Sequence, residues 1–124
     1  MRSIISIPAA ILTAFITLGA AQAQQQCVGS GTQTTFGANG TGYFEVKSGQ
    51  ACQYAFAMMG GGSVSSSRIS VRPRNGTARM LDLTSFVYKP KPGFRGSDTF
   101  AIEAVGSSIF GSGKSVVTMN VAVN

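Results

Sequence analysis

The side chains in this sequence that could take part in chemistry are mainly cationic. Its 124 residues include ten lysines and arginines against four acids, and they include no histidine. Without histidine the chain lacks the commonest general base and the commonest metal ligand of proteins. Seven of the cations lie between residues 68 and 95. Binding of an anionic partner is therefore the chemistry that these residues favour.

Catalysis and metal binding find little support among the other polar residues. Lys114 and Ser115 could form a nucleophilic pair, but adjacent residues of a strand point to opposite faces. The odd spacing of Asp98 and Glu103 along one predicted strand separates these two carboxylates in the same way. The four acids are not clustered, so they do not offer the six or more oxygen ligands of calcium. We therefore expect no enzyme, no metal site and no cofactor.

The first 23 residues have the pattern of an export signal. Arg2 precedes an apolar run from residue 4 to residue 18, which Pro8 interrupts and which is too short to span a membrane. The run is followed by Ala21-Gln22-Ala23, the small-x-small pattern read by signal peptidase. We predict a signal peptide over residues 1–23 and a single domain over residues 24–124 with no transmembrane segment. The protein is then periplasmic or extracellular.

The sequence contains two cysteines, Cys27 and Cys52. Because export leads to an oxidising compartment, a disulfide between them is the favoured interpretation, with free thiols or metal ligation as the alternatives. The bridge would close a loop of 25 residues and stabilise the fold by roughly 3 to 4 kcal/mol in the chain-entropy model.

Alternation of apolar and polar residues predicts strands throughout the remaining chain. The clearest cases are residues 68–72, 100–104 and 117–123, and weaker ones are 33–36, 43–46, 53–58, 78–81 and 85–89. The glycine- and serine-rich residues 58–67 are expected to form a flexible loop. Helical periodicity does not continue over two turns anywhere after residue 23. Seven or eight short antiparallel strands in a β-sandwich are the predicted all-β fold.

Residues 88–100 carry a motif of aromatic, proline, glycine and acidic positions. Its members are Tyr88, Pro90, Phe94, Gly96, Asp98 and Phe100, preceded along the chain by Pro73, Gly76 and Thr77. Over residues 68–123 this order resembles the bacterial cadherin-like, Ig-like repeats of surface adhesins. The resemblance implies an Ig-like Greek-key sandwich with an adhesive, spacing or ligand-binding role rather than a catalytic one.

Elementary physics gives the six residues of this motif a structural role, as a corner of the fold. Pro90 and Pro92 remove backbone donors and end a strand, and glycine allows the chain to turn tightly. Phe94 can fold back and close the open end of the core. We expect Asp98 to accept hydrogen bonds from loop amides.

The direction of three successive strands places most of the clustered cations together. The strand that contains Arg68 ends near Arg72, and the next two strands leave and return to the same end. We call the predicted set the basic rim, and we expect Arg68 to lie apart from it: Arg72, Arg74, Arg79, Lys89, Lys91 and Arg95. Acidic envelope polysaccharide, lipid headgroups or an envelope protein would suit this surface, and a purely solubilising role is the alternative. Nucleic acid is not expected, because the chain shows no nucleic-acid-binding motif.

These observations predict an exported, non-catalytic Ig-like binding or adhesion module. The alternatives are a structural envelope component without a soluble ligand, and a secreted enzyme inhibitor. The sequence leaves the ligand and the oligomeric state open.

Overall fold

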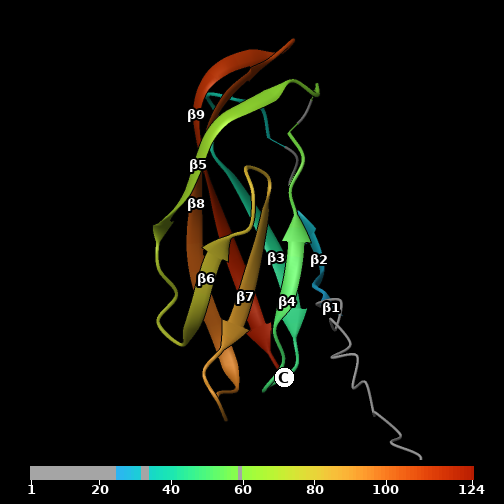
Figure 1. The fold of residues 1–124 in the computed structure, drawn as a ribbon, viewed down its shortest axis with the longest axis vertical. Coiled ribbons are helices and arrows are strands. Elements are labelled where there is room, and N and C mark those ends of the chain that lie inside the picture. The colour runs from blue at the N-terminus through green and yellow to red at the C-terminus, as the bar shows by residue number, and fades with distance from the viewer. Residues whose placement is uncertain (1–24, 32–33, 59) are drawn as a thin grey trace, which may run out of the picture.

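A computed structural model describes residues 25–31, 34–58 and 60–124 of the chain (Figure 1). Within these residues the fold is an all-β sandwich of two sheets and contains no helix. The strands follow one another along the chain as β1 (Gln25–Gln26), β2 (Val28–Gly31), β3 (Gly40–Val46), β4 (Cys52–Ala55), β5 (Ser63–Val71), β6 (Gly76–Met80), β7 (Ser85–Pro90), β8 (Gly96–Ser108) and β9 (Gly111–Val123).

The two sheets differ in width. The narrower sheet has the strand order β1-β4-β7-β6, and the wider sheet has the order β2-β3-β9-β8-β5. The last two strands, β8 and β9, are 13 residues long and pair along their whole length. They form the long hairpin that runs the height of the molecule in Figure 1, while β6 and β7 cover only its lower part.

Aromatic residues fill the space between the sheets. Phe44 on β3 and Phe100 on β8 face Phe86 and Tyr88 on β7, and all four side chains are fully buried. Their ring centroids lie 5.3 to 6.1 Å apart, mostly in tilted or edge-on arrangements. Such contacts contribute beyond the area that they bury. The inward positions follow the two-residue period of each strand, as the alternation in the sequence predicts.

The predicted disulfide between Cys27 and Cys52 is confirmed. The two sulfur atoms are bonded, and both residues are buried in the core cluster. Cys27 lies between β1 of the narrower sheet and β2 of the wider one, and its amide donates to the carbonyl of Gln53 over 2.9 Å. The bridge thus fixes the point at which the chain passes from one sheet to the other.

The prediction of a purely antiparallel fold was wrong, because both sheets are mixed. β1 pairs with β4 in parallel, and β3 pairs in parallel with β9 from Gly40↔Val117 to Val46↔Val123. Residue alternation identifies a strand and its buried face, but it carries no information on the direction of the neighbouring strand. The structure therefore shows a two-sheet sandwich of mixed strands.

Two local predictions were also wrong. Residues 34–36 form no strand: the chain turns instead, with Gly37 at φ 91°, and the hydroxyl of Thr34 donates to the carbonyl of Ala38 over 3.1 Å. Position 33 of that predicted strand lies outside the described residues. The predicted loop over residues 58–67 is shorter than expected, because β5 already begins at Ser63. There the long β8 offers backbone partners, so serines of low strand propensity are recruited to the sheet edge.

Each of the remaining predicted strands overlaps an observed one, with changed ends. The predicted strand over residues 53–58 ends at Ala55, although the amide of Phe56 still donates to the carbonyl of Thr84. Nine strands are present in the described residues instead of seven or eight, since the two-residue β1 was not expected and since β2 lies before the first predicted strand.

Candidate functional site

All six residues of the basic rim are exposed, and the fold brings most of them to one end of the narrower sheet. Arg72 and Arg74 lie in the connection from β5 to β6, and Lys91 follows the last residue of β7. The amide of Lys91 donates to the carbonyl of Asn75 over 2.9 Å, so this residue lies against the connection that carries Arg74. Arg95 directly precedes β8.

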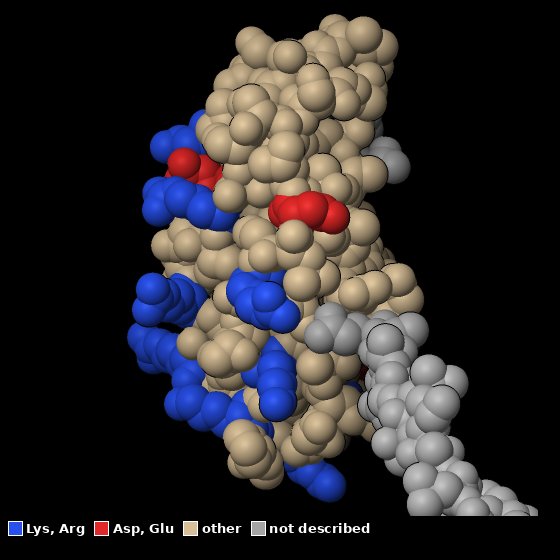
Figure 2. All heavy atoms as spheres, in the orientation of Figure 1, with Lys and Arg blue, Asp and Glu red and all other residues tan. Residues whose placement is uncertain are grey.

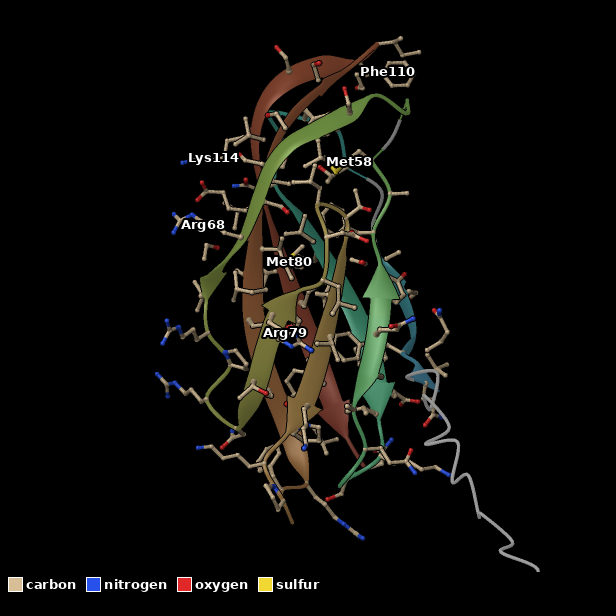
Figure 3. All side chains as sticks on the ribbon, in the orientation of Figure 1. Met58, Arg68, Arg79, Met80, Phe110 and Lys114 are labelled. Atoms are coloured by element: carbon tan, nitrogen blue, oxygen red, sulfur yellow. A yellow bond between two sulfur atoms is a disulfide. The ribbon has the colours of Figure 1, made fainter. Side chains whose placement is uncertain are left out.

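The other two residues of the basic rim project from the outer face of the narrower sheet. Lys89 on β7 pairs with Thr77 on β6, and Arg79 pairs with Val87. Arg79 is the fourth of the five residues of β6, so it lies nearer the middle of the sheet than the sequence suggested. In Figure 3 its label lies over this face, on β6. The basic rim therefore extends from the end of the sheet onto its outer surface.

The space-filling view shows how the charges are distributed. In Figure 2 lysine and arginine side chains run down one edge and around the lower end of the molecule, over the β5–β6 connection, β6 and the end of β7. Arg68 lies higher on the same edge, close to Lys114 (Figure 3). The upper end of this face carries no charged side chain.

The acids of the chain do not neutralise the basic rim, because each one is engaged elsewhere. Glu103 forms a 3.1 Å ion pair with Arg68, the only salt bridge among the described residues. Glu45 accepts a hydrogen bond of 2.8 Å from the hydroxyl of Tyr43. Asp82 accepts from the amides of its own turn, Thr84 and Ser85, and these bonds hold the pKa of its exposed carboxyl below the usual value.

Asp98 is the fourth acid, and it organises the corner that borders the basic rim. The residue is 5% exposed, and its carboxylate accepts four hydrogen bonds. Two come from the backbone amides of Arg74 and Asn75, each over 3.1 Å, and one comes from the amide of Thr99 over 2.9 Å. The fourth comes from the hydroxyl of Tyr88 over 2.7 Å. A buried carboxylate on β8 thus fixes the loop from which the side chain of Arg74 projects.

Tyr88 is shielded from water at this corner. Burial raises the pKa of its phenol well above the ordinary value, and the hydrogen bond to the negatively charged Asp98 raises it further. The phenol therefore stays neutral and remains a donor over the whole physiological range.

The other corner residues close the end of the core. β7 ends at Pro90, which is fully buried, and Gly93 and Gly96 have φ values of 79° and 134°. Phe94 is half-buried and packs against the core cluster, and its amide donates to the carbonyl of Lys91 over 3.0 Å. Pro90 and Phe94 thus lie at the end of the core, beside the cations.

The polar pairs considered for catalysis lie apart in the structure. Ser115 is fully buried and donates to the carbonyl of Thr35 over 3.0 Å, whereas the neighbouring Lys114 is exposed. Asp98 faces the interior, and Glu103 lies on the outer face with Arg68. The described part of the chain contains no group of three histidine, cysteine or acidic side chains placed to hold a metal ion. It also contains no helix long and apolar enough to cross a bilayer.

Two apolar surfaces were missed by the sequence reasoning. A cavity of about 240 Å³ opens between the edges of the two sheets, and its apolar lining includes Tyr54, Phe56, Met58 and Met119. The alternation of residues 54, 56 and 58 is the signal that could have shown it. The second surface is the turn between β8 and β9, where Ile109 and Phe110 are exposed. Two bulky apolar residues between serine and glycine, in Ser108-Ile109-Phe110-Gly111, were the available signal.

Comparison with known proteins adds no family to this description. The chain matches no protein-family model, and no curated protein is significantly similar to it in sequence.

Proposed function

We propose that this protein is an exported, non-catalytic Ig-like module that binds anionic polymers through the basic rim. One observation carries the proposal: six exposed cations border one sheet, and none of them has a carboxylate within ion-pair distance in the described part of the chain. An uncompensated group of cations attracts polyanions and releases their counterions on binding. Acidic envelope polysaccharide is the ligand class that suits an exported protein.

The corner supports this proposal because it gives the basic rim a defined shape. The loop that carries Arg74 is held by two amide hydrogen bonds to the buried Asp98. Lys91 is held against the same loop by its own amide. A ligand that meets a fixed array of charges requires less ordering of the protein on binding. The motif that resembles cadherin-like repeats, from Tyr88 to Phe100, forms this corner, and the two-sheet sandwich is compatible with an Ig-like adhesive module.

The proposal is tested by comparing two variants that lose the same number of charges. Arg74→Ser/Lys89→Ser removes two cations of the basic rim. Arg68→Ser/Lys114→Ser removes two cations from the upper part of the same edge (Figure 3). Arg79 is left intact because its partner Val87 is only 6% exposed on the outer face and would be uncovered. Lys47 is left intact because its turn lies at the same end as the basic rim.

The measurement is retention on immobilised polygalacturonate and heparin with increasing salt, at pH 5 and pH 8. Each cation near an anionic surface contributes up to about 1 kcal/mol before screening, so the variant of the basic rim, which loses two cations, should bind up to about 30-fold more weakly at low salt. The affinity of the matched variant Arg68→Ser/Lys114→Ser should change much less, although this variant leaves Glu103 without its ion-pair partner. Without histidine the parent should bind equally at both pH values. An equal loss of affinity in the two variants would show that binding depends only on the net charge of the protein and not on the basic rim.

A further inference from the structure

The turn between β8 and β9 presents two bulky apolar side chains to solvent. The hairpin pairs from Gly96↔Val123 to Ser108↔Gly111, and its turn lies at the upper extremity of the molecule (Figure 1). Ile109 is 83% exposed and Phe110 is 62% exposed. We call these two residues the apolar tip. Placing them in water is unfavourable, and the fold does not cover them.

The surroundings of the apolar tip are free of charge. Residues 104–113 contain no lysine, arginine or acid, and neither do residues 48–67, which include the glycine loop of residues 60–62. In Figure 3 Phe110 lies well beyond Lys114 and Arg68, the nearest labelled cations. The amide of Phe110 donates to the hydroxyl of Ser108 over 3.3 Å, so the backbone at the apex is partly satisfied within the turn. Moving this end of the protein out of water would therefore desolvate no charge.

The backbone of the glycine loop supports the position of the apolar tip. Gly60 lies directly against Phe110 and Ile109, and a Cβ at this position would overlap the Phe110 ring. Gly60, Gly61 and Gly62 all have positive φ, a conformation that side chains disfavour. The aromatic ring thus rests on the backbone of the glycine loop and still leaves most of the side chain exposed to solvent.

The size and shape of the apolar tip decide which partner it fits. Two such side chains offer on the order of 300 Å², or about 600 Å² when two copies meet, which is short of the roughly 1,000 Å² of total buried surface that a stable protein interface needs. A second copy docked through this turn would therefore not be held. A lipid bilayer requires no complementary pocket, because apolar side chains on a convex apex can enter the boundary between headgroups and acyl chains.

We propose that Ile109 and Phe110 insert into the interface of a lipid bilayer, independently of headgroup charge. The basic rim lies near the other end of β8, and 13 residues of strand span about 40 Å. This distance is several Debye lengths at physiological salt, so the basic rim does not take part in the insertion. The inserted protein presents its cations away from the membrane. This proposal rests on the apolar tip alone and stands whether or not the basic rim binds polymers.

The test uses vesicles of pure phosphatidylcholine in 0.5 M NaCl, a probe that the cations do not recognise. The parent protein should sediment with vesicles at millimolar lipid, and Ile109→Ser/Phe110→Ser should bind about tenfold more weakly. Leu81→Ser/Leu83→Ser is the matched control, because it removes two exposed leucines from the turn that contains Asp82. This control should bind like the parent. All proteins are prepared with the same N-terminus, verified by mass spectrometry, so that the apolar run of residues 4–18 contributes equally.

A spectroscopic readout tests the same proposal without removing the apolar tip. The chain contains no tryptophan, so Phe110→Trp places a single reporter at the apex. Its emission should shift to the blue when phosphatidylcholine vesicles are added, and brominated acyl chains should quench it. An unshifted emission, or equal binding by the parent and the Ile109→Ser/Phe110→Ser variant, would overturn the proposal. Unchanged retention of that variant on polygalacturonate would confirm that the two surfaces act separately.

Discussion

The hydroxyl of Tyr88 donates a hydrogen bond of 2.7 Å to the carboxylate of Asp98, and both residues are buried. The bond connects β7 to β8 across the two sheets, since these strands belong to different layers. The same carboxylate accepts the amides of Arg74 and Asn75. One acid therefore joins both sheets to the loop that carries part of the basic rim.

Removal of the hydroxyl should weaken the fold without changing its packing. Tyr88→Phe keeps the ring among the core aromatics and takes one of four donors from Asp98, so we expect a loss of about 1 to 2 kcal/mol in urea unfolding. Asp98→Ala should cost more, about 3 kcal/mol, because it deprives the amides of Arg74 and Asn75 of their acceptor. If Tyr88→Phe unfolded at the same urea concentration as the parent, the bond would contribute nothing to stability.

The raised pKa of Tyr88 predicts a loss of stability at alkaline pH. Above about pH 10 the tyrosine ionises in the unfolded chain but stays protonated in the folded one. The unfolded state therefore becomes more stable relative to the folded state as pH rises. Below about pH 10 the tyrosine is protonated in both states, so it does not make stability depend on pH. From pH 8 to pH 11 the free energy of unfolding should therefore decrease less steeply with pH for Tyr88→Phe than for the parent, and the two slopes should differ by up to about 1.4 kcal/mol per pH unit. Thermal unfolding at each pH measures this difference. Parallel curves for the two proteins would show that Tyr88 ionises equally in both states.

Loss of the disulfide should destabilise the protein substantially. Cys27→Ala/Cys52→Ala opens a 25-residue loop, for which the chain-entropy model gives about 3.5 kcal/mol. The parent under reducing conditions should show a similar fall in melting temperature. Labelling of the unreduced, folded parent with a thiol reagent should yield no adduct, and any adduct would contradict the bridge.

Phe94 should contribute less than the central aromatic residues. Because it is only half-buried against the core, Phe94→Ala should cost about 2 kcal/mol, compared with the 3 to 5 kcal/mol expected for the fully buried Phe86→Ala. Urea unfolding of both variants checks this order. A Phe94→Ala variant as stable as the parent but weaker on polygalacturonate would mean that the ring contacts the ligand instead.

The strands and their buried faces could be predicted from the sequence where the pattern is local. Phe100, Ile102 and Ala104 alternate in the sequence and are buried on β8, because a strand has a two-residue period whatever lies beside it. The short β7 was found for the same reason, since Phe86 and Tyr88 alternate with exposed or outer positions.

Features that depend on a distant partner were not predictable in this way. Ser65 and Ser66 carry no apolar signal and join β5 because β8 lies alongside them. The parallel pairing of β3 with β9 depends on the path of the intervening chain. For the candidate site, chain direction alone placed Lys89 and Lys91 near Arg74, but the position of Arg79 depended on where β6 begins.

The central position of β9 has a consequence for how the protein acquires its structure. This final strand lies between β3 and β8 in the wider sheet, and its pairing with β3 joins residues 77 positions apart, as in Gly40↔Val117. Closure of such a long loop is entropically costly and slows folding. Without the last strand, β3 and β8 would each expose an unpaired edge. The wider sheet therefore cannot close until β9 has been synthesised and placed between β3 and β8.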